Sequence, residues 1–101
     1  MSQWIKAIAL AELLPGTAKT CMVAGKELGL YNVAGKVYAT ENTCYHQGAP
    51  LADGRLEGTI ITCPWHAWKY DVTNGQCTRD ESIIIKTFPT KIEGEDIFVE
   101  V

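Results

Sequence analysis

The chain has 101 residues, of which 47% are hydrophobic and 21% are charged, a balance typical of globular proteins and unlike that of disordered chains. Nine lysines and arginines stand against 12 aspartates and glutamates, so the formal charge is −3 and no basic stripe is present for nucleic acid. We therefore expect one folded domain over residues 1–101 that does not bind DNA or RNA.

The first segment, residues 4–14, leaves helix and strand open, because its apolar positions fit a short amphipathic helix as well as a strand. The apolar run within it is interrupted by Glu12 and closed by Pro15, so it is too short and too polar to cross a bilayer. No basic stretch followed by a long apolar run marks a secretory signal. We expect a cytoplasmic protein that does not enter the membrane.

The rest of the chain is typical of short strands divided by turn residues, so the sequence predicts an all-β protein with little helix. The predicted strands are 28–33, 36–40, 59–62, 68–72, 83–88, 91–93 and 96–101. Ala34-Gly35 and Gly94 are expected to close hairpins, and Asn74-Gly75 is a further turn signal. These strands are expected to form one antiparallel sandwich or barrel with elaborated loops.

Two short motifs each pair a cysteine with a histidine: Cys44-Tyr45-His46 and Cys63-Pro64-Trp65-His66, separated by residues 47–62. Two thiolates and two imidazoles suit either zinc or an iron–sulfur centre. Zinc fingers usually place two cysteines before two histidines, whereas each pair here is mixed. A two-iron cluster with two cysteines on one iron and two histidines on the other takes one ligand of each kind from each loop, so the order favours iron.

The segments C-Y-H-Q-G-A-P-L at 44–51 and C-P-W-H-A-W-K-Y-D at 63–71 resemble the Rieske [2Fe-2S] family. The chain is also similar in length to the compact ferredoxins that serve bacterial aromatic-ring-hydroxylating oxygenases. The resemblance implies the Rieske fold, an antiparallel β-sandwich or barrel with a cluster-binding subdomain of two loops, about 43–51 and 62–71. It further implies one [2Fe-2S] cluster, with Cys44 and Cys63 on the inner iron and His46 and His66 on the outer iron.

The same resemblance implies a monomeric one-electron carrier that is not catalytic alone. It would accept electrons from an NAD(P)H-dependent flavoprotein, a ferredoxin reductase, and pass them to the terminal oxygenase of an aromatic-ring-hydroxylating dioxygenase. Other functions stay open: the small Rieske-like subunit of assimilatory nitrite reductase, or the ferredoxin of a diiron aromatic monooxygenase. A zinc-stabilised interaction module without a redox role is a further alternative.

Departures from the family pattern imply how the cluster is tuned. Respiratory Rieske proteins carry an additional cysteine in each loop, and Ala49 and Trp65 at these positions cannot form that disulfide. Trp68 stands where high-potential members place a serine that donates to a bridging sulfide, so we expect a potential towards the low end of roughly −150 to +300 mV. Tyr70 matches the family's tyrosine near the cluster cysteine.

Other side chains have an ordinary structural interpretation beside a functional one. Cys21 and Cys77 are expected to be small apolar fillers or free thiols. Trp65 and Trp68 either shield the cluster or offer a docking surface, or they simply pack in the core. Six carboxylates are candidates for steering a basic reductase or for an ordinary solvated surface. They are Asp71, Asp80, Glu81, Glu93, Glu95 and Asp96.

Overall fold

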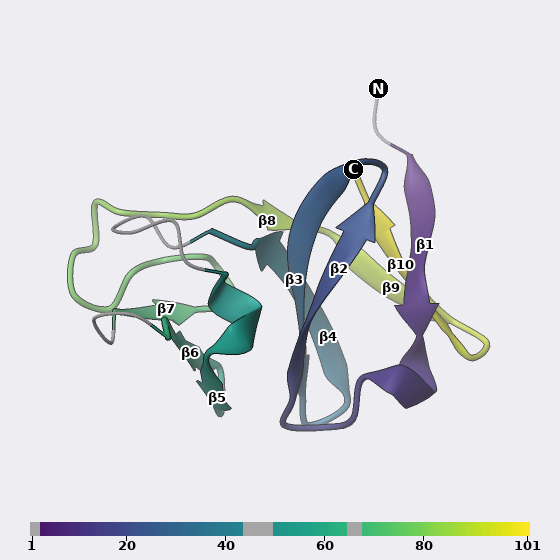
Figure 1. Cartoon of the computed structure of the whole chain (residues 1–101), viewed down its shortest axis with the longest axis horizontal. Helices are drawn as coiled ribbons and strands as arrows, with labels where there is room; N and C mark the ends of the chain where they lie inside the picture. The colour runs from purple at the N-terminus through teal and green to yellow at the C-terminus, as the bar shows by residue number, and fades with distance from the viewer. Residues whose placement is uncertain (1–2, 44–49, 65–67) are drawn as a thin grey trace.

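The computed structural model describes residues 3–43, 50–64 and 68–101. They form short antiparallel strands, as the sequence predicts, and the strands are arranged in three sheets (Figure 1). The strands are β1 Trp4–Ala9, β2 Ala18–Val23, β3 Lys26–Val33, β4 Lys36–Glu41, β5 Arg55–Glu57, β6 Ile60–Thr62, β7 Lys69–Asp71, β8 Thr87–Phe88, β9 Thr90–Glu93 and β10 Asp96–Glu100. Helix in the described chain is confined to two single turns, η1 Leu10–Glu12 and η2 Leu51–Asp53. None of the helices in this part of the chain is long and apolar enough to span a bilayer.

The central sheet has the order β2-β3-β4-β8. The predicted turn between β3 and β4 is confirmed, since Ala34 and Gly35 have φ of 52° and 96°, the left-handed values that a tight hairpin turn requires. An equivalent turn at Ala24 and Gly25, with φ of 52° and 81°, joins β2 to β3. Strand β2 was not predicted from the sequence.

A second sheet, in the order β1-β10-β9, packs on one face of the central sheet. Residues 4–14, which fit helix and strand equally well as a sequence, form strand β1 followed by η1. Pairing with β10 decides this choice, because it places Ile5 opposite Val99 and satisfies the backbone of β1 in a ladder. The hairpin predicted around Gly94 is confirmed as the turn between β9 and β10, and Gly94 has a φ of 62°.

The third sheet, β5-β6-β7, lies at the opposite end of the molecule from the β9–β10 turn (Figure 1). Strands 59–62 and 68–72 of the prediction correspond to β6 and β7, and the Asn74-Gly75 turn follows them. The prediction of one strand over 83–88 is wrong for its first four residues. Ile84 makes only an isolated bridge to Gln76 and its side chain is exposed. Ile85 is buried, and its N–H donates to the Gly75 carbonyl, so these residues contact the third-sheet region without forming a ladder.

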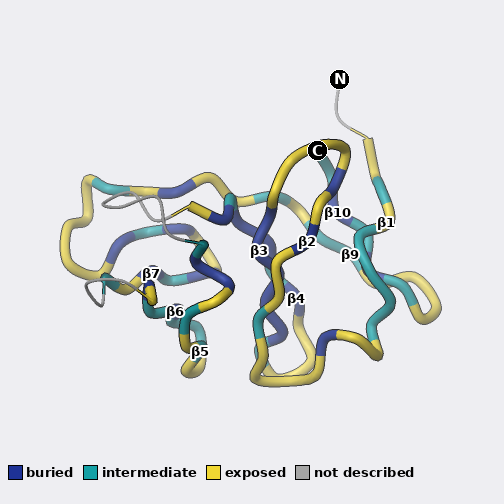
Figure 2. The backbone as a smooth tube through the Cα atoms, viewed as in Figure 1, coloured by how far each residue is buried: buried dark blue, intermediate teal, exposed yellow. Residues whose placement is uncertain are grey.

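The central sheet has a hydrophobic core on each face, and Figure 2 shows its strands β3 and β4 as largely buried. Side chains alternate along a strand, so Leu28 and Leu30 of β3 enter the core beneath β1 and β10, whereas Tyr31 enters the core shared with β5, β6 and β7. The third sheet, whose middle strand β6 leads into Cys63, therefore packs on the same central sheet that holds the rest of the fold together.

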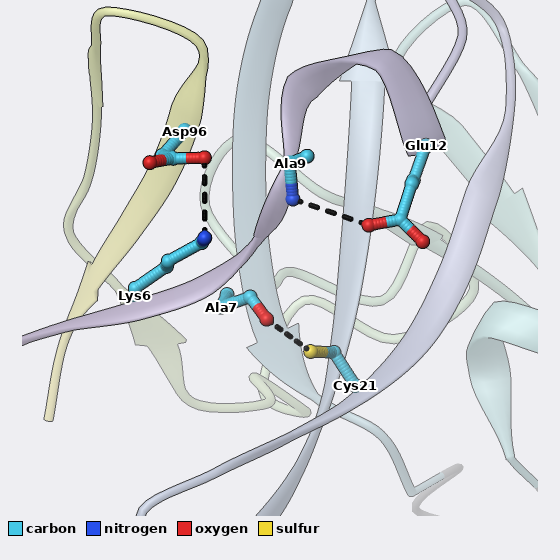
Figure 3. Close-up of polar contacts among 6 residues, drawn as sticks. All are labelled: Lys6, Ala7, Ala9, Glu12, Cys21 and Asp96. Carbon is cyan, nitrogen blue, oxygen red and sulfur yellow. Dashed lines mark hydrogen bonds and ion pairs between the residues drawn. The ribbon is translucent and has the colours of Figure 1, made fainter.

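Cys21 and Cys77 are confirmed as buried fillers, and they belong to different cores, so they do not form a disulfide with each other. The Cys21 thiol lies 3.3 Å from the Ala7 carbonyl oxygen, to which it donates, and this bond ties β2 to β1 (Figure 3). Burial is the main reason why the pKa of Cys21 is raised. The ion pair of Lys6 with Asp96, at 3.4 Å, secures β1 on its other side.

Candidate metal centre

The structure describes one of the four predicted ligands, Cys63, whereas Cys44, His46 and His66 lie outside the described residues. The predictions for Ala49 and Trp65 also fall outside them. Across residues 3–43, 50–64 and 68–101 no three histidine, cysteine or acidic side chains gather as a metal site.

Cys63 follows directly after β6 and is only 2% exposed. Its backbone N–H donates to the carbonyl oxygen of Trp68 at 2.6 Å, which joins the two flanks of residues 65–67. The pairing of β6 with β7 continues from this bond, with Thr62 opposite Lys69. The prediction that the second motif lies on a loop is confirmed for Cys63 and Pro64, which are outside any strand.

The chain that follows the first motif returns to the same core. Pro50 leads into η2, where Leu51 is fully buried in one hydrophobic cluster with Cys63, Ile61 and Tyr70. A Cβ atom on Gly54, just after η2, would overlap the carbonyl oxygen of Thr62, the residue before Cys63. The flanks of both ligand motifs therefore meet in one place, although the motifs are separated by residues 47–62 in the sequence.

This environment fits an iron–sulfur cluster. The predicted donor set of two thiolates and two imidazoles is the one that a Rieske centre uses, and each motif of the sequence contains one cysteine and one histidine. On the described side, Cys63 is backed by fully buried Ile61, Leu51 and Tyr70. Such apolar packing keeps water away from the thiolate side of a site, and burial is one of the factors that set a cluster's potential.

Two described aromatic residues flank the second motif. Tyr70 is fully buried in the core that contains Cys63, whereas Trp68 is half-buried and packs at the edge of that core. The guanidinium of Arg79 lies 5.6 Å from the centre of the Trp68 ring, a cation–π contact. Arg79 was missed from the sequence, because nothing in its neighbourhood indicates that residues 78–80 fold back against the second motif.

Asn42 was missed as well. It lies two residues before Cys44, is 1% exposed, and its side-chain oxygen accepts the N–H of Ala52 at 2.8 Å across the first motif. No periodicity or spacing distinguishes this asparagine from the other asparagines of the chain. Its only sequence signal is its place next to a predicted ligand.

The six candidate steering carboxylates do not form one patch. Asp80 and Glu81 belong to the segment beside the third sheet, whereas Glu93, Glu95 and Asp96 surround the β9–β10 turn at the other end (Figure 1). Several are engaged locally: Glu93 pairs with Lys91 at 2.7 Å, and Asp71 accepts both the N–H and the hydroxyl of Thr73. Two hydrogen bonds from Ser82 lower the pKa of Asp80, and the bond from the hydroxyl has a larger effect than the bond from the backbone N–H.

Comparison with known proteins agrees with this site. The family described as Rieske [2Fe-2S] domain matches residues 3–89. The ferredoxin component of the naphthalene 1,2-dioxygenase system of Pseudomonas aeruginosa is 43% identical over 97% of this chain and 95% of its own length. The ferredoxin of carbazole 1,9a-dioxygenase from Nocardioides aromaticivorans IC177 superposes with a TM-score of 0.89 over 96% of each chain, at 27% identity.

A third match is a solved complex of reduced oxygenase and oxidized ferredoxin in carbazole 1,9a-dioxygenase, with a TM-score of 0.85 and 31% identity over 95% of this chain and 91% of that one. The fold, the mixed donor pairs and these relatives agree with one another. The chain therefore belongs to the Rieske [2Fe-2S] family, and its cofactor is one Rieske-type [2Fe-2S] cluster.

Proposed function

We propose that this protein carries single electrons from an NAD(P)H-dependent flavoprotein reductase to the terminal oxygenase of an aromatic-ring-hydroxylating dioxygenase. The observation that carries the proposal is near full-length similarity to a ferredoxin component of such a system, at 43% identity. The solved complex of a related ferredoxin with its oxygenase supports the second partner. When bound, the cluster supplies a one-electron couple, and the chain has the roles of holding, shielding and presenting it.

The proposed ligands are Cys44 and Cys63 for one iron and His46 and His66 for the other. Burial of Cys63 supports its place on the inner side of the site. The bond from its N–H to the Trp68 carbonyl fixes the start of the second ligand segment, at 2.6 Å. A potential towards the low end of the Rieske range follows from Trp68, whose side chain has no hydroxyl to donate to a sulfide.

We also propose one domain over residues 1–101, with ligand segments at about 43–51 and 62–71, that works as a monomer in the cytoplasm. Two cores on opposite faces of one sheet support a single folding unit. Light scattering on the purified protein tests the oligomeric state, and a dimer mass would contradict this part of the proposal.

The ligand assignment is tested by comparing two buried cysteines of the same core. Cys63→Ala should abolish iron, acid-labile sulfide and the visible absorption of the purified protein. Cys77→Ala should keep two irons and two sulfides per chain and lose only about 1–2 kcal/mol of stability, as expected for truncating a fully buried side chain. Equal iron in both variants, or a wild-type protein with zinc and no sulfide, would contradict the proposed ligation.

The electron-transfer role is tested with purified partners. The reduced protein should show the electron paramagnetic resonance spectrum of a Rieske cluster. The signal of this protein's own cluster should fall when oxidised terminal oxygenase is added and takes up the electron, and addition of NADH and a flavoprotein reductase should restore it. A cluster that neither partner oxidises or reduces would argue against the carrier function while leaving the cluster itself established.

A further inference from the structure

Asn42 joins three elements through one buried side chain. Its amide nitrogen donates to the Thr20 hydroxyl at 2.9 Å and to the Glu27 carboxylate at 3.0 Å, while its amide oxygen accepts the N–H of Ala52 at 2.8 Å. Thr20 is on β2, Glu27 is on β3, and Ala52 is in η2. A single asparagine therefore connects the central sheet to the chain on both sides of residues 44–49.

The bond to Ala52 is the costly one to lose. Ala52 is 6% exposed, so water reaches its N–H poorly once the Asn42 oxygen is removed, and a buried donor without a partner is unfavourable. Thr20 and Glu27 are exposed and regain water more readily. The bonds to Thr20 and Glu27 therefore orient the Asn42 amide. This orientation points the amide oxygen at the N–H of Ala52.

We propose that Asn42 is a positioning residue for the cluster, and that its amide fixes the separation and direction of the chain where the first ligand segment leaves and rejoins the fold. This inference rests on the proposed ligands Cys44 and His46, which lie between Asn42 and Ala52 in the sequence. The position of η2 also affects the second ligand segment, because Gly54, just after η2, packs against the carbonyl of Thr62 next to Cys63. Side chains that orient metal ligands typically change metal affinity about 10- to 100-fold when they are removed.

The test compares Asn42→Ala with Asn32→Ala. Asn32 is a matched control because it is 2% exposed and also fixes a loop, donating to the Leu13 carbonyl at 2.7 Å and accepting the Gly35 N–H at 2.8 Å. Both variants lose a buried amide, but Asn32 is on β3, and its bonds hold Leu13 and the β3–β4 turn and not the flanks of the ligand motifs. At a temperature where both remain folded by circular dichroism, Asn42→Ala should release iron to a chelator about tenfold faster than Asn32→Ala. Its reduced cluster should also show shifted g values.

A second comparison separates positioning from general instability. Asn42→Asp keeps an oxygen for the Ala52 N–H but places a carboxylate against Glu27, so it should also accelerate iron release. Combining Asn42→Asp with Glu27→Gln reverses donor and acceptor in that contact at unchanged net charge. The combined variant should return the release rate and the g values towards the wild type, and this comparison decides the matter if Asn42→Ala does not fold.

Similar iron release and unchanged g values in Asn42→Ala and Asn32→Ala would overturn the proposal, as would a combined variant no better than Asn42→Asp alone. A wild-type protein without iron would instead defeat the proposed ligation. Because the wild type is measured in each assay, the two failures are distinguishable.

Discussion

Tyr31 is a fully buried phenol at the boundary between the central sheet and the core that contains Cys63. Its hydroxyl lies 2.8 Å from that of Thr40. Burial raises the pKa of Tyr31 to about 12, against the smaller lowering effect of the Thr40 hydrogen bond. A residue that packs behind the metal centre is therefore also a source of pH-dependent stability.

The ionised form of Tyr31 is disfavoured in the folded protein, whereas an unfolded tyrosine ionises near pH 10. The stabilisation is complete below pH 10 and is lost as the pH rises towards 12, by about 1.4 kcal/mol per pH unit in this window. Urea unfolding of the wild type and of Tyr31→Phe between pH 8 and 11 measures this loss. We expect a steeper decline in the wild type, and parallel declines would show that another group titrates.

At the scale of elements, two hairpin turns of the central sheet share an unusual feature. Ala24 and Ala34 both have a φ of 52°, a left-handed conformation that costs an alanine roughly 1–2 kcal/mol. Each is followed by glycine, which adopts such a φ without penalty. The first position of each turn therefore stores strain in a part of the molecule away from the third sheet.

Asn is favoured over Ala at the first position of such turns, so Ala24→Asn and Ala34→Asn should each stabilise the protein by about 0.5–1 kcal/mol. Thermal or urea unfolding measures the gain, and iron content and g values should stay unchanged. Gly35→Ala is the opposing control, and it should destabilise because Gly35 has a φ of 96°. Destabilisation by both asparagine variants would contradict the turn assignment.

The turns could be predicted because their signals are local. A dipeptide such as Ala34-Gly35 favours a hairpin by its own backbone preferences. The four ligands Cys44, His46, Cys63 and His66 stay a prediction, drawn from the two mixed Cys-His motifs. Strand β2 was missed although its partner β3 is adjacent in sequence, because Ala18–Val23 has few β-branched and no aromatic residues. The bonds of Asn42 could not be predicted, because they depend on partners distant in sequence, such as Thr20. The prediction at 83–88 failed because a short apolar run indicates a strand whether or not it finds a pairing partner, and here only Ile85 of residues 83–86 is buried.

At the scale of the whole molecule, the six candidate steering carboxylates are divided between two ends. The third sheet and the flanks of the ligand motifs lie at one end, and the β9–β10 turn lies at the other (Figure 1). Charges act on an approaching partner mainly within about one Debye length, roughly 8–10 Å at physiological salt. Of the six candidates, steering of a reductase towards the cluster should therefore come from Asp71 of β7 and from Asp80 and Glu81.

Exchanging Asp80→Asn together with Glu81→Gln should slow reduction by the flavoprotein a few-fold at low ionic strength and flatten its salt dependence. Glu93→Gln with Glu95→Gln changes net charge equally and should leave both unaffected. Stopped-flow reduction at several salt concentrations measures the difference. The prediction fails if the two pairs behave alike.

Strand β3 supplies both cores from one backbone, with Leu28 and Leu30 on one face and Tyr31 on the other. One inserted or deleted residue would exchange the two sets, bringing a phenol among aliphatic side chains and a leucine to the Thr40 hydroxyl. Changes of chain length are therefore tolerated in the turns at either end of this strand but not within it. Members of the family that differ in length should keep this eight-residue segment intact.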